Sequence, residues 1–203
     1  GSGEWLWKPY IILKTLEEMN SGDYLFYCDS GAFMRRSCRY IFETMDDSDL
    51  WISDIPLIEK QWTKPIVFQR LGVSQREDIL NSNQIQGGFV GIRKSKQSVE
   101  LIREWLTYCC DKELLLPLSE DEEKGECIAH REDQSLLSVL SKIKGIKCHK
   151  DPTQYGRIPE KYKGIKAIYS VPLHMEDDYP TVILLHRSGN CNLGIIIKQW
   201  FNI

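Results

Sequence analysis

The sequence has no run of about 18 apolar residues and no charged segment followed by an apolar one at its start, so it predicts neither a membrane-spanning helix nor a secretion signal. It also lacks an excess of one charge. There are 26 Lys and Arg residues against 29 Asp and Glu residues, a formal net charge of −3. We therefore expect no nucleic-acid partner, because binding that ignores base sequence needs a strongly basic surface. Internal repeats and low-complexity tracts are absent too, which excludes collagen and coiled coils.

Cysteine is present without a pattern. The seven cysteines are odd in number, lie far apart and include no C-x-x-C pair, which argues against a disulfide framework and a zinc ribbon. We expect reduced thiols in a cytoplasmic protein, several of them acting as small apolar core residues. With 42% hydrophobic and 27% charged residues, the chain can bury an ordinary core, most simply as one domain over residues 1–203.

Helical and strand patterns alternate along the chain. Apolar residues at helical spacing predict helices at residues 7–19, 99–109 and 133–143. Apolar runs predict strands at residues 24–28, 49–53, 87–92, 146–148 and 181–185, the first and last of them covered on both faces. Residues 63–71 fit either a helix with Pro65 in its first turn or a strand, and the acidic residues 117–126 predict a solvated loop. The fold class is therefore α/β, with layers of helices on a sheet.

Two predicted strands end in side chains that can bind a metal. Asp29 follows the first buried strand and His186 follows the last. Open α/β sheets place ligands at the carboxyl ends of their strands, and a carboxylate with an imidazole can share Mn²⁺ or Mg²⁺. The alternative is that Asp29 is a turn residue and His186 a hydrogen-bonded surface histidine.

Four blocks in order along the chain resemble the GT-A fold nucleotide-sugar glycosyltransferases, especially the relatives of glycogenin and of bacterial lipopolysaccharide galactosyltransferases. Trp5 to Gly31 is similar to the helix and strand that lead into the Asp-x-Asp motif, and Ile85-Gln86-Gly87-Gly88 to the strand with the Asn-x-Gly acceptor segment. Residues 132–137, with Asp133 and Gln134, resemble the Asp-Gln-x-Leu motif, and residues 186–189 the late His-x-x-Gly. The WLWKPY opening and Trp62-Thr63-Lys64 resemble members from bacterial polysaccharide loci.

The resemblance implies a GT-A-like mixed sheet flanked by helices and the transfer of a sugar from a nucleoside diphosphate sugar, such as a UDP-hexose, to a glycan or lipid-linked acceptor. It implies work in the cytoplasm, at the inner face of the membrane, where such acceptors are presented. The implied site residues are Asp133 and Gln134 at the donor sugar, Lys8, Asp29, Gly31 and Lys198 at the donor phosphates, Asp29 and His186 on a divalent cation, and Gln86, Gly87 and Gly88 on the acceptor side.

The sequence departs from the family pattern at several places. Gly31 stands where the second carboxylate of the Asp-x-Asp motif would be, and Gln86 stands for the Asn of the acceptor segment. Eight residues separate Gly189 from Lys198, more than the family has before its Lys-Pro-Trp. The strands and helices that hold the nucleotide base in that family have no counterpart before Trp5. Three explanations stay open: a fragment, a transferase descendant without donor binding, or a base held in another way.

Each residue also has a structural reading. Lys8 could be a surface charge, Asp133 the N-cap of its helix, and Gly87 and Gly88 part of a core strand. The tryptophans Trp5, Trp7, Trp51 and Trp62 could stack on sugars or be buried. At the level of function, Asp29 and Asp133 could be the two carboxylates of a glycosidase, and the chain could be a non-catalytic, degenerate transferase fold that binds a glycan or a partner.

Overall fold

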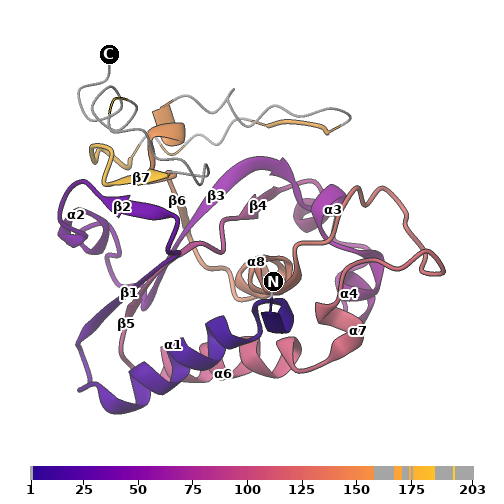
Figure 1. The fold of residues 1–203 in the computed structure, drawn as a ribbon, viewed down its shortest axis with the longest axis horizontal. Coiled ribbons are helices and arrows are strands. Elements are labelled where there is room, and N and C mark those ends of the chain that lie inside the picture. Colours follow the sequence, from indigo (N-terminus) through magenta and orange to yellow (C-terminus); the bar gives the residue numbers. More distant parts are fainter. Residues whose placement is uncertain (1, 158–166, 171–173, 175, 186–193, 195–203) are drawn as a thin grey trace.

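The computed structural model describes residues 2–157, 167–170, 174, 176–185 and 194 (Figure 1). Within them, the helices are η1 (Ser2–Trp5), α1 (Trp7–Glu18), α2 (Arg39–Phe42), α3 (Glu59–Trp62), α4 (Pro65–Arg70), α5 (Glu77–Leu80), α6 (Lys96–Cys109), α7 (Lys112–Leu115), α8 (Glu132–Ile143) and η2 (Gln154–Arg157). The strands are β1 (Tyr24–Cys28), β2 (Ala32–Met34), β3 (Leu50–Ile58), β4 (Asn83–Ile85), β5 (Phe89–Arg93), β6 (Cys148–His149) and β7 (Ile183–Leu185). Helices and strands alternate, as predicted for an α/β chain.

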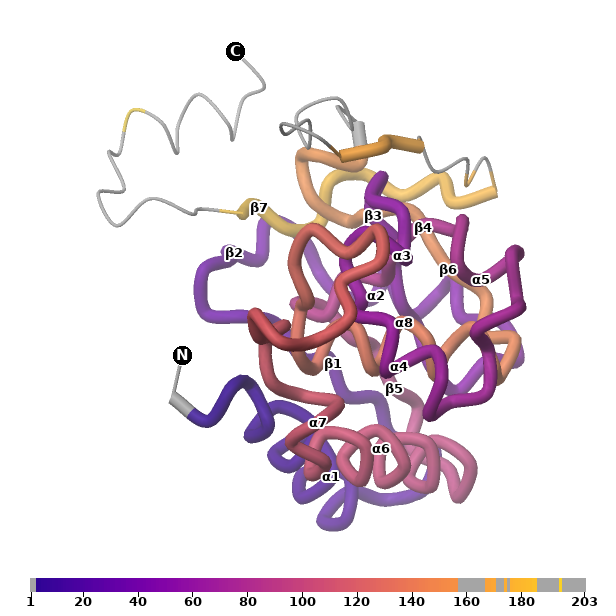
Figure 2. Tube along the Cα trace, turned by 90° about the vertical axis from the view of Figure 1, so that its right-hand side faces the viewer, coloured from indigo at the N-terminus to yellow at the C-terminus, as the bar shows by residue number. Residues whose placement is uncertain are grey.

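The main sheet is mixed. Its strand order in the described residues is β1-β5-β3-β4, and β6 pairs with β3. The pairs β1–β5, β5–β3 and β3–β4 are antiparallel, whereas β3–β6 is parallel. A second, two-stranded sheet joins β2 and β7 above the end of β1 (Figures 1 and 2). The prediction of a mixed sheet with helices is confirmed at this level.

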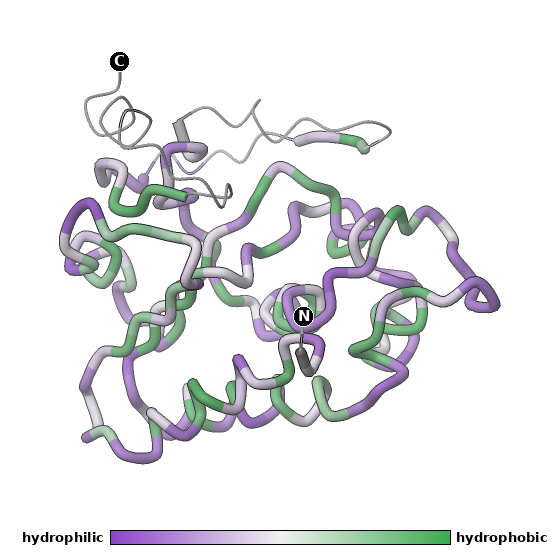
Figure 3. Tube along the Cα trace, in the orientation of Figure 1, coloured by the Kyte–Doolittle hydropathy of each residue, from purple (hydrophilic) through white to green (hydrophobic). Residues whose placement is uncertain are grey.

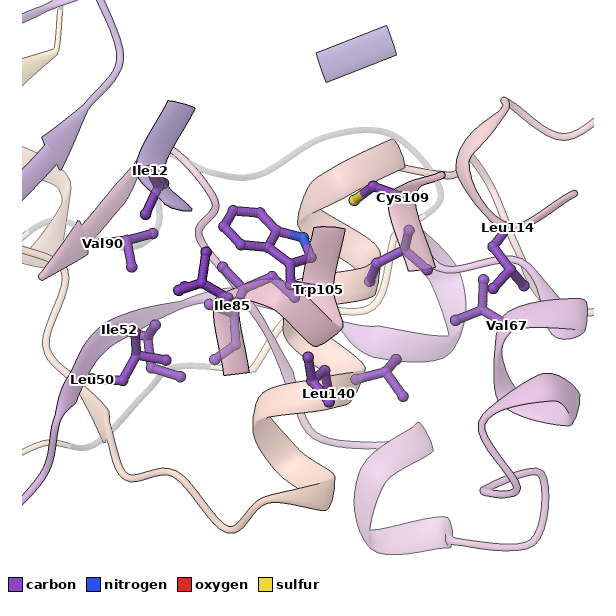
Figure 4. Close-up of a cluster of buried hydrophobic side chains, with 14 of the residues drawn as sticks. Ile12, Leu50, Ile52, Val67, Ile85, Val90, Trp105, Cys109, Leu114 and Leu140 are labelled. Carbon is purple, nitrogen blue, oxygen red and sulfur yellow. The ribbon is translucent and has the colours of Figure 1, made fainter. Parts of the chain in front are cut away.

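Both faces of the main sheet are covered by apolar side chains. Alternate residues of a strand point to opposite faces, so Leu50 and Ile52 of β3 face the helices while Trp51 faces the other way. On the helical face, α1 packs on α6 and α6 on α8, with Trp105 at the centre of the larger apolar cluster (Figure 4). On the opposite face, Trp51 packs with Phe89 of β5 and residues of β7.

Local sequence signals explain where the helices begin. Pro65 is the first residue of α4, where its missing N–H is not needed, and this decides residues 63–71 in favour of a helix. At the start of α6, Ser95 Oγ accepts a hydrogen bond from Ser98 N, and Ser95 N donates to Ser98 Oγ. Hydrophobic and hydrophilic residues alternate along α1 and α6, as expected of helices with one buried face (Figure 3).

The first predicted strand differs from the expectation of burial on both faces. All three residues of β7 are buried, but β1 is only partly buried, and Tyr24 is 46% exposed. The reason is the position of β1 at one end of the described strand order, so that one edge and part of one face stay open. Its aromatic residues pack sideways instead, for example Tyr24 on Phe42 at a ring-centroid distance of 4.8 Å.

The end of β1 has different neighbours from those predicted. The prediction assumes a parallel sheet, in which the carboxyl ends of neighbouring strands lie together. Here β1 and β5 are antiparallel, with Cys28 opposite Phe89, so the end of β1 meets the start of β5. Asp29 N therefore donates a hydrogen bond to the carbonyl of Gly88, at 2.9 Å.

Candidate functional site

A cleft of about 540 Å³ opens where four parts of the chain meet, which is within the range of roughly 300–1,000 Å³ found for ligand pockets. These parts are the η1–α1 junction, the end of β1, the start of β5 and the first turn of α8. Figure 1 shows η1 in front of α8, and the two pack on each other. The lining residues are Trp5, Trp7, Tyr27, Cys28, Asp29, Ser30, Gly31, Gln86, Gly88, Phe89, Gln134 and Leu185.

A larger groove, of about 690 Å³, lies elsewhere on the surface, beside β5 and α6. Four of its charged side chains form two ion pairs: Arg93 Nε lies 2.7 Å from Asp49 Oδ1, and Lys144 Nζ lies 2.7 Å from Glu104 Oε2. The groove is built from ordinary surface ion pairs, so we place the candidate site in the smaller cleft.

Lys8 lies buried behind the wall of the cleft. Its Nζ is 2.8 Å from Asp133 Oδ2 and 4.0 Å from Asp29 Oδ1, and it donates a hydrogen bond to the carbonyl of Gly87 at 3.1 Å. The residue is 4% exposed, so the interpretation as a surface charge is wrong. Lys8 is buried because it points inward from the first turn of α1, where its ammonium group lies 5.7 Å from the ring centroid of Tyr27.

Asp133 is the second residue of α8, and Arg131 occupies the N-cap position, so the N-cap interpretation is wrong as well. Asp133 is 2% exposed and pairs with Lys8. Burial raises the pKa of Asp133 to about 6, because it disfavours the charged form; the Lys8 ammonium opposes this shift. The contact with Lys8 is an ion pair without hydrogen-bond alignment, since no described group makes a hydrogen bond to Oδ2. Asp133 thus supports the cleft from behind.

Gln134 lies in the cleft and connects α8 to the start of β5. Its Oε1 accepts a hydrogen bond from Gly87 N at 3.1 Å, and its Nε2 donates to Gln84 Oε1 at 2.9 Å. Gln86, on the same wall, accepts a hydrogen bond from Ser53 Oγ at 3.4 Å. The amides of Gln134 and Gln86 are thus held by hydrogen bonds within the protein, and both residues line the cleft.

Gly87 and Gly88 are required for close packing at this point. A Cβ on Gly87 would lie 2.9 Å from Gln134 Cβ, and one on Gly88 would lie 2.9 Å from Asp29 Oδ2. Gly87 therefore packs closely on Gln134, and Gly88 on Asp29. Both glycines lie just before β5, which begins at Phe89.

Asp29 is the charged side chain that lines the cleft in the described part of the chain, and its side chain is 43% exposed. The phenol of Tyr27 donates a hydrogen bond to Asp29 Oδ1 at 2.8 Å. Burial and this bond raise the pKa of Tyr27 above its ordinary value. Sequence reasoning missed Tyr27, although its place two residues before Asp29 on a strand puts both side chains on one face.

Cys28 also lines the cleft and was not predicted there. Burial raises the pKa of its thiol to about 11, so Cys28 stays protonated and is not an activated nucleophile. The six described cysteines are free thiols, in agreement with the expectation of reduced cysteines.

The tryptophans divide into two pairs. Trp5 and Trp7 line the cleft and are 39% and 42% exposed. Trp51 is fully buried and stacks on His149 at 5.7 Å, and Trp62 is covered by the guanidinium of Arg131 at 4.5 Å. Of these four tryptophans, Trp5 and Trp7 are the pair whose rings are open to stacking on a ligand.

The described residues do not form a metal site by themselves. No group of three or more His, Cys, Asp or Glu side chains within them could hold a metal ion. Asp29 offers a single carboxylate, and the Lys8 ammonium beside it disfavours a second cation by like-charge repulsion. His186, the other predicted ligand, and Lys198 lie outside the described residues, so the predicted Mn²⁺ or Mg²⁺ stays a prediction.

Comparisons of the chain with protein-family models, with curated proteins and with solved structures found no match. Among the helices that the structure describes, none is long and apolar enough to cross a bilayer.

Proposed function

We propose that the cleft binds a sugar and that the chain is a glycosyltransferase, which moves a hexose from a nucleoside diphosphate sugar to a glycan or lipid-linked acceptor. The observation that carries the proposal is convergence. Lys8 and Asp29 come from the first of the sequence blocks that resemble one enzyme family, Gly87 from the second and Gln134 from the third, and they contact one another around one cleft.

The chemistry of the cleft suits a sugar. The Asp29 carboxylate and the amides of Gln86 and Gln134 can form hydrogen bonds with hydroxyl groups, and the rings of Trp5, Trp7 and Tyr27 line the same cleft. The Lys8 ammonium lies between the two carboxylates, 4.0 Å from Asp29 Oδ1 and 2.8 Å from Asp133 Oδ2. These contacts would orient the sugar, which is a major part of catalysis when a bound group must meet an acceptor.

Transfer also requires stabilisation of the diphosphate that leaves. Lys198 and His186, which the resemblance assigns to that role, lie outside the described residues. By the same resemblance, the reaction would take place in the cytoplasm at the inner face of the membrane.

A glycosidase fits the geometry less well. Hydrolysis needs two carboxyl groups that flank the bond. Asp29 faces the cleft, but Asp133 is 2% exposed, lies behind Lys8 and does not line the cleft. A non-catalytic sugar-binding module is the second candidate, because Asp29 is the single ionised side chain among the described lining residues.

Calorimetric titration of the full chain tests these candidates. The titrants are UDP-glucose, UDP-galactose and their free sugars, each with and without Mn²⁺, and UDP release in the presence of acceptors gives the rate of transfer. Asp29→Asn should weaken binding or transfer at least about tenfold, since a hydrogen bond to a charged group contributes about 1.5–3 kcal/mol. The exposed Asp121→Asn is the matched control and should leave both unchanged.

The outcomes separate the candidates. Binding of the UDP-sugars with transfer supports the enzyme. Binding of free sugars alone, sensitive to Asp29→Asn, supports the binding module. If neither sugars nor UDP-sugars bind under any of these conditions, both candidates are wrong.

A further inference from the structure

Three neighbouring aromatic rings line the cleft. The ring centroids of Trp5 and Trp7 are 6.2 Å apart, and those of Trp7 and Tyr27 are 6.4 Å apart. We call these three residues the aromatic row. The row ends at the candidate site, because the phenol of Tyr27 donates its hydrogen bond to Asp29.

The exposure of the row is unusual for tryptophan. Trp51 and Trp105 are fully buried, whereas Trp5 and Trp7 leave 39% and 42% of their surface in solvent. Large aromatic side chains gain much of their stabilising effect from burial, so two adjacent exposed indoles at the mouth of a cleft mark a binding surface.

The backbone presents Trp5 at a conformational cost. Trp5 has a φ of 65° and Glu4 a φ of 44°, both in the left-handed region that bulky side chains avoid. This conformation directs the Trp5 ring to the cleft that it lines with Trp7. An ordinary helical turn would avoid the cost of the positive φ values, but it would not place the Trp5 ring at the cleft.

The lining points to a neutral ligand with apolar faces and polar edges. Aromatic rings have a negative face that attracts the polarised C–H bonds on the flat side of a pyranose ring. In the same cleft, Asp29, Gln86 and Gln134 offer hydrogen bonds for hydroxyl groups. The row is longer than one ring, so a single sugar at Asp29 would leave Trp5 and Trp7 uncovered.

We infer that the aromatic row is a binding site for a neutral oligosaccharide, with its terminal sugar at Tyr27 and Asp29 and its next units on Trp7 and Trp5. The inference rests on the proposed function for the identity of the ligand as a sugar. It adds that the substrate is an extended glycan, recognised over two or more units.

A membrane surface is the less suitable occupant. Tyr10 and Ile11 are exposed on the next turn of α1, but Trp5 and Trp7 line a concave cleft that ends at a carboxylate. Of the two lysines on that helix, Lys8 is buried, and Lys14 is paired with Glu17 at 2.8 Å instead of being free to meet anionic lipid. Binding to vesicles is therefore an outcome of the test that would contradict the inference.

The test measures affinity against chain length. Malto-, cello- and galacto-oligosaccharides of one to four units are titrated into the full chain, with intrinsic tryptophan fluorescence and calorimetry as readouts. For at least one series, affinity should rise about tenfold between one and three units. Trp7→Ala and Trp5→Ala should each reduce the affinity for the longer members about three- to tenfold, and so flatten this rise.

Tyr10→Ala is the matched control, because Tyr10 is 53% exposed on the same helix and does not line the cleft. It should leave the length dependence intact. The inference is overturned if no series binds, if affinity does not depend on length, if Tyr10→Ala has the same effect as Trp7→Ala, or if Trp7→Ala instead abolishes binding to vesicles of phosphatidylcholine and phosphatidylglycerol.

The two proposals fail separately. Length-dependent binding of oligosaccharides without any binding of UDP-sugars contradicts the transferase and leaves the aromatic row as a glycan site. Transfer from a UDP-sugar to a monosaccharide, with no gain from longer acceptors, contradicts the row and leaves the transferase.

Discussion

Lys142 and Lys8 each reach a carboxylate that is at most 2% exposed, Glu59 in the first pair and Asp133 in the second. Glu59 lies between α3, β4 and α8 and accepts hydrogen bonds from four side chains: Thr63, Gln84, Ser138 and Lys142. Asp133 has the ion pair with Lys8 and no hydrogen bond to Oδ2 within the described residues.

The difference in hydrogen bonding distinguishes the role of the Lys142–Glu59 pair from that of the Lys8–Asp133 pair. A buried carboxylate with all its lone pairs occupied holds elements together and has no capacity left for a ligand. The Lys8 ammonium instead divides its charge between Asp133 and Asp29, and Asp29 is exposed in the cleft. The same two residue types thus make a structural contact in the core and a support for the candidate site.

The largest effect that we expect is on stability, at the core pair. Glu59→Ala removes four hydrogen-bond partners and leaves the Lys142 ammonium without its carboxylate, so the free energy of unfolding should fall by about 3–5 kcal/mol. Urea unfolding followed by circular dichroism measures it. The exposed Glu123→Ala should stay within about 0.5 kcal/mol of the wild type, and a similar value for Glu59→Ala would contradict the structural role.

The second effect is on binding, at the cleft pair. Lys8→Met removes the cation that lies between Asp29 and Asp133, so affinity for the sugar ligand should fall about 100-fold, or about 2.7 kcal/mol. Lys142→Met serves as the comparison, because it breaks the core pair away from the cleft. Titration is done at a temperature where both variants are folded. Equal losses of affinity in the two variants would remove the distinction between the pairs.

The third effect is a dependence of folding stability on pH, which arises from Asp133 of the cleft pair. The pKa of Asp133 is about 6 in the folded chain against an ordinary value of 3.8, so the folded state holds its proton more tightly. The stability from this proton is complete below about pH 4 and is lost as the pH rises through about 6, at roughly 1.4 kcal/mol per pH unit.

Asp133→Asn isolates that contribution. The free energy of unfolding of the wild type relative to the variant should fall by about 2 kcal/mol between pH 4.5 and pH 7.5. Urea unfolding at both pH values measures it. Parallel pH profiles for the two proteins would show that Asp133 titrates normally.

The smallest effects come from two adjacent glycines, and they differ in kind. A Cβ on Gly87 meets Gln134 Cβ and, at 3.2 Å, the backbone Cα of Gln134, so Gly87→Ala should cost about 1–3 kcal/mol of stability. A Cβ on Gly88 meets the movable end of Asp29. Gly88→Ala should therefore displace Asp29, with about tenfold weaker sugar binding and a change in stability below about 1 kcal/mol. Loss of stability without loss of binding in Gly88→Ala would contradict the role of Asp29.

Much of the site was predictable as a list of residues, and little of it as an arrangement. Asp29, Gln86, Gly87, Gly88, Asp133 and Gln134 were chosen from motifs, and the structure brings them together. Their roles were less accessible. Lys8 and Asp133 were given surface or capping alternatives because a charged residue in the first turn of a helix is usually solvated, and burial by another segment leaves no mark in the local pattern.

The sequence by itself determined the α/β class, the positions of α1, α6 and α8 and the buried strands β3 and β7, because periodicity and end signals act within a few residues. It also determined which polar residues stand beside strands. Only the tertiary structure decided that β1 pairs antiparallel with β5, that Lys8 enters the space between Asp29 and Asp133, and that Trp5 and Trp7 stay exposed while Trp51 does not. These outcomes depend on the register and packing of segments far apart in the chain, whose energies no local pattern contains.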